Sequence, residues 1–401
     1  MPTEPTHDER VTAHAALSRL VGDVPAFVGH CFGQRVHHVA AADANGFADL
    51  LSLDDVDDIV ASTGMRAPAF RLVRDGATLP RAAVTRRARI GSRPVDDLVD
   101  VAAVHREFAA GATIVLQGLH RSWGPVTALC RSLETSLTHP VQANAYLTPP
   151  ISQGLHVHAD PHDVFAVQTY GVKRWVVHPE GAAHPLDVEL HPGDVLYLPA
   201  GTRHAAQTVQ RPSLHLTIGV RTLRLRDVAR RVVEVALSDP ALDTPLPPRW
   251  AEDPELLATQ LVHRLADVGR ELAAVEPPQA ATAIQDAADD FWGNRPPSLT
   301  GGLRDTLEVH HLDDATLLRR RANVTCRLRV DGDQLDVLLG DRRLSMPGRL
   351  EPVLRRMAQA ESFAPKELDD LIDEPSRLVL CRRLVREGLL TMDRSLVEPR
   401  D

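Results

Sequence analysis

Residues 155–165 read LHVHADPHDVF and place His156, His158, Asp160 and His162 on alternate positions. Alternate residues of a β-strand point to the same face, so this spacing can bring all four side chains together. Imidazole and carboxylate groups are common ligands of transition metals in proteins. The stretch therefore predicts a β-strand that carries a metal site.

The chain around this stretch predicts a barrel or sandwich. Between residues 140 and 222, short β-rich runs follow one another, and Gly, Pro or Asn/Asp turns separate most of them. No helical periodicity interrupts the runs, which favours a sandwich or a barrel. Residues 191–209, HPGDVLYLPAGTRHAAQTV, predict a strand, a tight turn and a second strand that begins at His204. In a double-stranded β-helix (cupin) barrel, such a segment faces an earlier HxD or HxH strand.

A mononuclear Fe(II) oxygenase needs two histidines and one carboxylate on one face of the metal, so that the other positions stay open for co-substrate and O2. His158 and Asp160 can supply two of these ligands from one strand, and His204 can supply the third from an opposing strand. A centre of three histidines and a glutamate is the competing choice, but no glutamate stands at a suitable place in the first segment. We therefore choose His158, Asp160 and His204 as the metal ligands.

The other histidines of this region are interpreted as surface or hydrogen-bonded residues. Binding the metal with His156 and His162 as well would fill the open positions, although either residue can still contact substrate. Asp163 is expected to orient a ligand or cap a turn. The same surface or hydrogen-bonded interpretation applies to His184, His191 and His215.

Lys173 is unusual in this chain. Of 45 Lys and Arg residues only two are lysines, and Lys173 lies 15 residues beyond His158 in the strand-like run VKRWVV. A lysine presents a compact ammonium group, which suits a carboxylate at the bottom of a narrow barrel. We expect Lys173 to bind a co-substrate carboxylate; the alternative is an exposed strand lysine.

These segments resemble a known family. QANAYLTPP, GLHVHADPHDVFAVQTYGVKRW, HPGDVLYLPAGTRHAAQT and SLHLTIGV are similar to the JmjC-type 2-oxoglutarate oxygenases of the ribosomal oxygenase (cupin-4) group. The resemblance implies an α+β protein with a double-stranded β-helix barrel. Its implied domains are a JmjC catalytic domain at 1–222 with a barrel core at about 140–222, a helical dimerisation domain at 223–298 and a winged-helix-like domain at 299–401.

The resemblance also implies roles for individual residues. The family's iron triad falls on His158, Asp160 and His204, and its basic residue for the distal carboxylate of 2-oxoglutarate falls on Lys173. Asn144 and Tyr146 match polar residues that line the same pocket, although both can equally pack and hydrogen-bond within the barrel. The implied cofactors are Fe(II), 2-oxoglutarate as co-substrate and O2.

The function implied by the resemblance is hydroxylation of a protein or peptide substrate, namely an arginine or histidine of a ribosomal protein. The same chemistry on a modified peptide or a small natural product is an alternative, and demethylation of a side chain is a third outcome. A hypothesis of another class is a non-catalytic cupin scaffold whose winged helix binds nucleic acid.

The charge, the cysteine spacing and the apolar content of the chain indicate which partners and which compartment to expect. The formal net charge is −9, and residues 341–401 hold as many acidic as basic residues, so we expect no direct nucleic-acid binding. Four widely spaced cysteines predict free thiols in a reducing cytosol. The N-terminus is polar and no apolar run approaches the ~20 residues of a membrane helix, so we expect a cytoplasmic protein without membrane contact. Amphipathic helices at 223–240 and 253–275, together with the family's habit, predict a homodimer.

Overall fold

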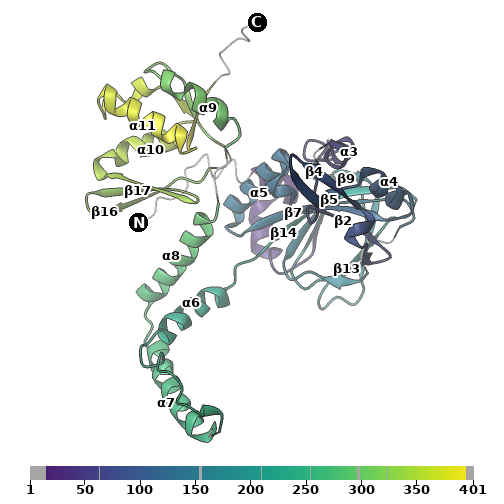
Figure 1. Cartoon of the computed structure of the whole chain (residues 1–401), viewed down its shortest axis with the longest axis horizontal. Coiled ribbons are helices and arrows are strands. Elements are labelled where there is room, and N and C mark those ends of the chain that lie inside the picture. The colour runs from purple at the N-terminus through teal and green to yellow at the C-terminus, as the bar shows by residue number, and fades with distance from the viewer. Residues whose placement is uncertain are drawn as a thin grey trace. The chain divides into compact units, whose positions relative to one another are not determined.

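The computed structural model describes residues 15–62, 64–152, 156–208, 210–252, 254–295, 299–322 and 324–393. These residues form two compact units that divide after Thr222. We call them the barrel unit and the C-terminal unit and describe each by itself (Figure 1). The polar N-terminal residues 1–14 lie outside the described residues, as do residues 153–155, which include Leu155 at the start of the stretch LHVHADPHDVF.

The barrel unit begins with helices and continues mostly as strands. Residues 15–21 are helical, and the later helices are α2 (Val24–His30), α3 (Leu53–Ser62), α4 (Val101–Ala109) and α5 (Gly124–Leu137). The strands of the N-terminal half are β1 (His37–Val39), β2 (Phe70–Arg74), β3 (Ala77–Thr78), β4 (Thr85–Ile90), β5 (Arg93–Val99) and β6 (Thr113–Leu116). The later strands are β7 (Val141–Thr148), β8 (His158–Ala159), β9 (Asp163–Gly171), β10 (Lys173–His178), β11 (Leu186–Leu190), β12 (Val195–Leu198), β13 (Arg203–Gln207) and β14 (Ser213–Val220).

Two sheets build the barrel. The larger has eight strands in the order β1-β12-β9-β14-β7-β6-β2-β3, and the smaller has four in the order β11-β10-β13-β8. Their facing sides share one apolar cluster, in which Val164 and Leu196 of the larger sheet pack with Trp175 and Val177 of the smaller. This packing closes one side of the space between the sheets.

Strand β9 shows why the larger sheet has two different faces. Val164 and Ala166 lie in the cluster between the sheets, whereas Phe165 and Val167 belong to a larger core that also contains the helices of the N-terminal half. Successive residues of a strand point to opposite faces, so β9 reads as a continuous apolar run buried on both sides. The helices therefore cover the outer face of the sheet and leave the inner face to the barrel interior.

The larger sheet extends beyond the predicted barrel core at 140–222. β6 and β2 continue it from β7, and β1 pairs with β12 at its other end. An edge strand presents unpaired backbone N–H and C=O groups, and these added strands satisfy them. Which edge of the sheet these strands join depends on long-range pairing and not on any local pattern in the sequence.

The predicted strand that carries the four alternating ligands is also shorter than expected. β8 comprises only His158 and Ala159, so the period-two argument does not extend to His156 and His162. Pro161 follows Asp160 directly, and a proline cannot donate a hydrogen bond to a β-ladder.

The C-terminal unit contains three helices followed by a mixed α/β part. The helices predicted in this region appear as α6 (Leu225–Leu237) and α7 (Pro254–Ala273), and a third helix, α8 (Pro277–Gly293), starts at the prolines that end the second. Proline is well suited to the first turn of a helix, where its missing N–H has no intrahelical role. The remaining elements are α9 (Gly302–Glu308), β15 (Leu318–Arg320), β16 (Arg327–Asp331), β17 (Gln334–Leu339), β18 (Arg342–Pro347), α10 (Glu351–Gln359), β19 (Ser362–Phe363), α11 (Glu374–Arg386) and β20 (Leu390–Met392).

The mixed part of the C-terminal unit has its own core. β16, β17 and β18 form one sheet, with a hairpin turn between Asp331 and Gln334, and β19, β15 and β20 form another. Residues of both sheets and of α10 and α11 share one apolar cluster. All four cysteines are free, as predicted. No described helix is both long and apolar enough to cross a membrane.

Candidate metal centre and its cavity

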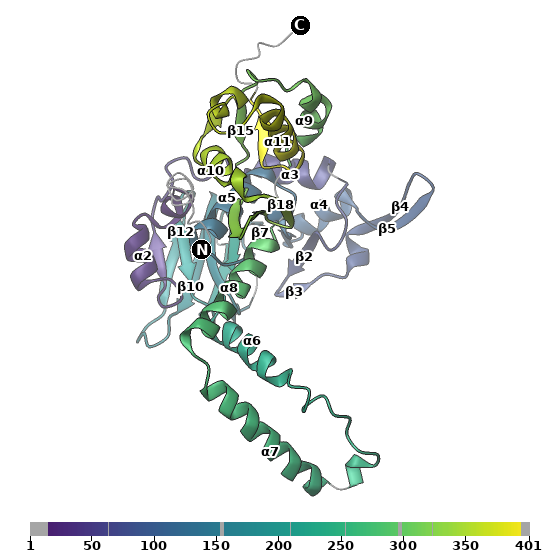
Figure 2. The ribbon, with the colours of Figure 1, turned by 90° about the vertical axis from the view of Figure 1, so that its left-hand side faces the viewer.

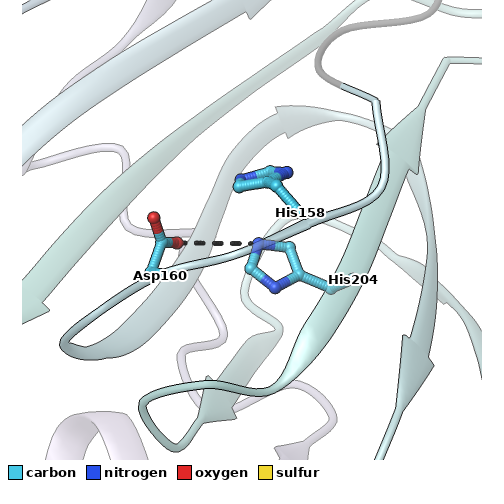
Figure 3. Close-up of side chains that lie close together, drawn as sticks. All are labelled: His158, Asp160 and His204. Atoms are coloured by element: carbon cyan, nitrogen blue, oxygen red, sulfur yellow. Dashed lines mark ion pairs between the residues drawn. The ribbon is translucent and has the colours of Figure 1, made fainter.

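His158, Asp160 and His204 come together at one place in the barrel unit. The pairing of β8 with β13 sets His158 directly opposite His204, and Asp160 follows β8 by one residue (Figure 3). One potential ligand atom of each residue lies within 4.8 Å of the others, and Asp160 Oδ2 is 3.7 Å from His204 Nε2. Among the described residues, this is the one group of three His, Cys, Asp or Glu side chains with such spacing.

Backbone carbonyl oxygens fix the tautomer and the orientation of the His158 and His204 imidazoles. Nδ1 of His158 lies 2.8 Å from the carbonyl oxygen of His156, and Nδ1 of His204 lies 2.9 Å from that of Thr202. A carbonyl oxygen only accepts hydrogen bonds, so each Nδ1 donates and each Nε2 keeps its lone pair. Burial lowers the pKa of His204 and so favours the neutral ring that binds metals.

Asp163 holds the turn that leads to His204. Its side chain is buried; one carboxylate oxygen accepts a hydrogen bond from the backbone N–H of Ala200 at 2.9 Å, and the other accepts the Tyr197 hydroxyl. The backbone N–H of Gly201 donates to the carbonyl of Asp160 at 2.8 Å. Asp163 therefore fastens the turn before β13, in line with the prediction that it orients a ligand or caps a turn.

The two histidines and the carboxylate suit a divalent transition metal. Imidazole nitrogen and carboxylate oxygen bind such ions at about 2.0–2.2 Å, so three ligand atoms this close together can share one ion after small side-chain movements. A set of two histidines and one carboxylate on one side leaves the opposite positions free, which is the arrangement of non-haem iron oxygenases. The residues present therefore fit Fe(II).

A cavity of about 190 Å³ adjoins these three residues and reaches between the two sheets. Its wall contains all six residues singled out in the sequence: His158, Asp160, His204, Lys173, Asn144 and Tyr146. Further residues of the wall are Arg71, Val73, Thr113, Val115, His162, Val164, Trp175, Ala206, His215 and Thr217.

Lys173 is a buried residue of the cavity wall, with only 3% of its surface exposed. Its ammonium group donates a hydrogen bond to Thr148 Oγ1 at 3.1 Å, and Thr148 in turn accepts one from Thr113. Within the described residues it forms no ion pair, and desolvation alone lowers its pKa to about 7. The alternative of an exposed strand lysine is therefore wrong.

Asn144 and Tyr146 both face the cavity from β7. Asn144 Oδ1 accepts a hydrogen bond from the backbone N–H of Gly118 at 2.9 Å, so this side chain also braces the barrel. The Tyr146 ring stacks on His215 with a centroid distance of 5.1 Å, and burial raises the pKa of its hydroxyl. Asn144 and Tyr146 therefore both line the cavity and make contacts that support the barrel.

His215 is not a surface histidine, although, as expected, it does not belong to the metal-ligand group. His215 is 3% exposed and lines the cavity between Tyr146 and Trp175, and its buried Nδ1 has no hydrogen-bond partner among the described residues. Burial, with a smaller contribution from Lys173, holds its pKa well below the usual value. An uncharged imidazole with an unpaired nitrogen on a cavity wall is a candidate contact for a bound molecule.

The remaining histidines lie where the sequence interpretation placed them, with one exception. His184 and His191 are exposed, and His156 is exposed and packs over Gly76 in the turn between β2 and β3. His162 instead reaches the cavity wall and packs over Gly219, a position where any Cβ would collide with its ring. Of the two surplus histidines in the opening stretch, His162 is thus the one that lines the cavity.

Sequence reasoning missed His215 and Thr217 on the cavity wall and Thr148, the hydrogen-bond partner of Lys173, although a usable signal was present. In VQANAYLT and SLHLTIGV, polar side chains alternate with apolar ones that enter the core. Alternation puts Asn144, Tyr146 and Thr148 on one face of β7. Arg71 carried no such signal, because its place on the wall depends on the pairing of β2 with β6.

Comparison with known proteins gives the same picture of the barrel unit. Residues 123–228 match the family model of the JmjC domain. The chain is 38% identical over 138 residues to a bifunctional lysine-specific demethylase and histidyl-hydroxylase, NO66, of Drosophila simulans, a match that covers 29% of this chain and 16% of that protein. It is 28% identical over 253 residues to mouse ribosomal oxygenase 2, covering 56% of this chain and 54% of the mouse protein.

Solved structures resemble this chain in fold over more of its length than the sequence matches cover. The crystal structure of the Escherichia coli ribosomal oxygenase YcfD superposes with a TM-score of 0.52 at 19% identity and covers 92% of this chain and 98% of that one. A structure of YcfD in complex with cobalt and 2-oxoglutarate has a TM-score of 0.52 at 18% identity, with the same coverage. The chain spans about half or less of the length of the curated relatives named above. Residues 123–228 therefore match the JmjC domain, and the chain is similar in fold and in part of its sequence to ribosomal oxygenases.

Proposed function

We propose that this protein is an Fe(II)- and 2-oxoglutarate-dependent hydroxylase of a protein side chain, namely an arginine or histidine of a ribosomal protein. The observation that carries the proposal is the combination of His158, Asp160 and His204 with a buried lysine on one cavity. A buried ammonium group without a carboxylate partner is costly, and a dicarboxylate ligand supplies the missing charge. The names of the relatives, a histidyl-hydroxylase and a ribosomal oxygenase, support the choice of reaction and substrate.

The three ligands define what the chain contributes to metal binding. His158 and His204 offer Nε2 and Asp160 offers a carboxylate oxygen, and the hydrogen bonds at both Nδ1 atoms keep the rings in this orientation. When bound, iron with 2-oxoglutarate and O2 supplies the oxidant that hydroxylates a C–H bond while the 2-oxo acid becomes succinate and CO2.

Lys173 positions the co-substrate. Its ammonium group, held by the hydrogen bond to Thr148, and the nearby Thr113 form a polar end of the cavity where the distal carboxylate of 2-oxoglutarate would bind. Tyr146 and His215 lie beside it and offer further polar contacts. A carboxylate there keeps the proton on Lys173 Nζ, because the paired charges stabilise each other in a buried site.

Apolar residues keep water away from the centre. Val164, Trp175 and Ala206 line the cavity wall next to the metal ligands, and the Trp175 ring lies 5.7 Å from the His204 ring. Excluding water strengthens the electrostatic contacts inside the site and limits side reactions of the oxidant. The open end of the cavity then admits the substrate side chain.

Two alternatives keep the same chemistry. The Drosophila relative is named as a lysine-specific demethylase as well as a hydroxylase, so demethylation through hydroxylation of a methyl group is a second candidate. A modified peptide or small natural product is another substrate class. A non-catalytic scaffold is disfavoured, because a scaffold has no need for an intact ligand triad beside a buried lysine.

The C-terminal unit is assigned by the same resemblance. We propose that α6, α7 and α8 form a dimerisation domain, since they expose apolar side chains such as Leu225, Val235, Leu261 and Val262. We propose that residues 299–401 form a winged-helix-like domain, in which α10 and α11 are the helices and β20 the strand that follows them. The free cysteines suit a reducing compartment, and we place the protein in the cytoplasm.

The decisive experiment begins with protein purified without oxygen. We expect one Fe(II) per chain and slow conversion of 2-oxoglutarate to succinate in the absence of substrate. Mass spectrometry of ribosomal proteins from cells with and without the enzyme should then show a difference of one oxygen atom on an arginine or histidine peptide. Absence of succinate formation by the iron-loaded protein would refute the proposed reaction, and turnover without any modified ribosomal peptide would refute the substrate.

A further inference from the structure

Strands β4 and β5 form a basic hairpin at the edge of the barrel unit. Between Gly76 and Val95 the chain has five arginines and no aspartate or glutamate, although the whole chain has a formal net charge of −9. Four of these arginines, Arg86, Arg87, Arg89 and Arg93, belong to β4 and β5 themselves. We call these four residues the hairpin arginines.

The hairpin stands apart from the two sheets of the barrel. β4 and β5 pair only with each other as a separate two-stranded sheet, apart from one bridge between Arg66 and Leu98 at the hairpin's base. Figure 2 shows the two strands projecting from the rest of the barrel unit. Strands of this length extend about 20 Å, so the hairpin presents its side chains well out into solvent.

The hairpin arginines are exposed and uncompensated. All four are exposed, and none forms an ion pair within the part of the chain that the structure describes; one contact is a hydrogen bond from Arg89 to the Ser92 carbonyl within the same turn. Other arginines of the barrel unit do pair, such as Arg19 with Asp43 and Arg74 with Glu107. The acidic residues of β5, Asp96 and Asp97, lie toward the hairpin base, where Asp97 pairs with Arg66, and no acidic residue stands between Gly76 and Val95.

We infer that this hairpin is a binding surface for the phosphate backbone of RNA. Guanidinium groups bind phosphate oxygens in bidentate fashion, and a row of them along a ribbon can contact successive phosphates of one strand. A cationic peptide substrate would be repelled by the hairpin, so its partner is a polyanion. The choice of RNA rests on the proposed function, because ribosomal proteins act beside ribosomal RNA.

This inference limits the earlier expectation of no direct nucleic-acid binding. That expectation used the charge of the whole chain and of residues 341–401, whereas phosphate binding depends on the local charge of one surface. The opposing interpretation is that the arginines only protect the free edges of a two-stranded sheet from pairing with other chains. Arginines that only protect the sheet edges would not bind RNA, so RNA-binding measurements distinguish edge protection from the proposed RNA-binding role.

The test measures binding of the full chain to a fluorescently labelled single-stranded RNA of mixed sequence by anisotropy over a range of salt concentrations. The hairpin variant is R86Q/R87Q/R89Q/R93Q. Its matched control removes four exposed arginines elsewhere in the barrel unit that also lack ion pairs within the described chain: R35Q/R121Q/R211Q/R221Q. A second variant, with lysine at all four hairpin positions, keeps the charge.

We expect the wild-type protein to bind at micromolar concentration in low salt, and the hairpin variant to bind at least about tenfold more weakly. The slope of log Kd against log salt should fall by about two to three in the hairpin variant, since each contacted phosphate of a single strand contributes about 0.7. The lysine variant should keep most of the slope, and the control variant should behave as the wild type.

Equal binding by the hairpin and control variants would overturn the inference, and so would a wild-type protein that binds anionic phospholipid vesicles but no RNA. Succinate release without substrate keeps this result separate from the proposed function, because the hairpin arginines do not line the cavity. Turnover without RNA binding refutes the hairpin inference alone, and RNA binding without turnover refutes the proposed reaction alone.

Discussion

His158 and His204 are direct cross-strand partners, with ring centroids 4.5 Å apart, although they come from strands far apart in the chain. Because β8 has only two residues, this pairing with β13 is what fixes the position of His158. The metal ligands are therefore held by sheet register and by the turn before His204, rather than by a long ligand-bearing strand.

Replacing a metal ligand should abolish iron binding and turnover. We expect His158→Ala or Asp160→Ala to lose Fe(II) by metal analysis of the purified protein, and to release no succinate. His156→Ala is the matched control, because its backbone carbonyl still accepts the hydrogen bond from His158 and its side chain is exposed. Full turnover in both ligand variants would show that the metal lies elsewhere.

Lys173 should make co-substrate binding dependent on pH. Its pKa of about 7 in the free protein lies far below the ordinary 10.5, and a bound dicarboxylate favours the charged form. Binding then takes up a proton above pH 7, so KM for 2-oxoglutarate should rise up to about tenfold per pH unit there. Lys173→Arg stays charged at all these pH values and should lose this dependence; a flat profile in the wild type would contradict the role of Lys173.

The lowered pKa of Lys173 also predicts how the stability of the protein without co-substrate depends on pH. The lysine pKa is lower in the folded protein than in the unfolded chain, so between pH 7 and 10.5 the unfolded chain holds the extra proton. The contribution of Lys173 to folding therefore improves as pH rises through this window. Lys173→Met should remove that part of the pH dependence of Tm, measured by calorimetry against the wild type.

His215 should contact the co-substrate through a ring nitrogen. His215→Phe keeps an aromatic ring beside Tyr146 and Trp175 but removes both nitrogens. A lost hydrogen bond to a charged group is worth about 1.5–3 kcal/mol, so KM for 2-oxoglutarate should rise at least about tenfold with the fold intact. An unchanged KM together with a raised Tm would instead identify His215 as a packing residue whose unpaired nitrogen only costs stability.

Asp163 should affect the metal site through the turn before His204. Asp163→Ala leaves the Ala200 N–H and the Tyr197 hydroxyl without their acceptor, at a cost of about 1–3 kcal/mol for each buried group. We expect a lower denaturation midpoint and weaker Fe(II) binding. Asp194→Ala is a useful comparison, since it removes another buried carboxylate that anchors backbone N–H groups at Ala41 and His191; it should lower stability without the same loss of iron affinity.

The exposed apolar residues of α7 should mediate self-association. Leu261 and Leu265 lie one turn apart and are 55% and 50% exposed. Light scattering at micromolar concentration should show a dimer for the wild type and a monomer for Leu261→Glu/Leu265→Glu. Leu303→Glu on α9, which removes an even more exposed leucine, should remain dimeric. A monomeric wild type would refute the dimerisation domain.

The sequence by itself determined that the region is a barrel or sandwich of short strands and which ligands to choose; the double-stranded β-helix came from the resemblance to a family. Short strands separated by turns, and two histidine-bearing segments, sufficed to predict His158, Asp160 and His204, because strand periodicity and ligand chemistry are local properties. A single lysine in an arginine-rich chain likewise drew attention to Lys173. The resemblance to a family added Asn144 and Tyr146.

Only the tertiary structure decided which side chains share the cavity. Arg71, Thr113 and His215 come from three separate strands, and their common face follows from the order and register of the larger sheet. The burial of Lys173, the unpaired nitrogen of His215 and the isolation of the hairpin arginines also depend on what packs around them. Such contacts are long-range in the chain, so no local pattern encodes them, and strand register decides which residues finally meet.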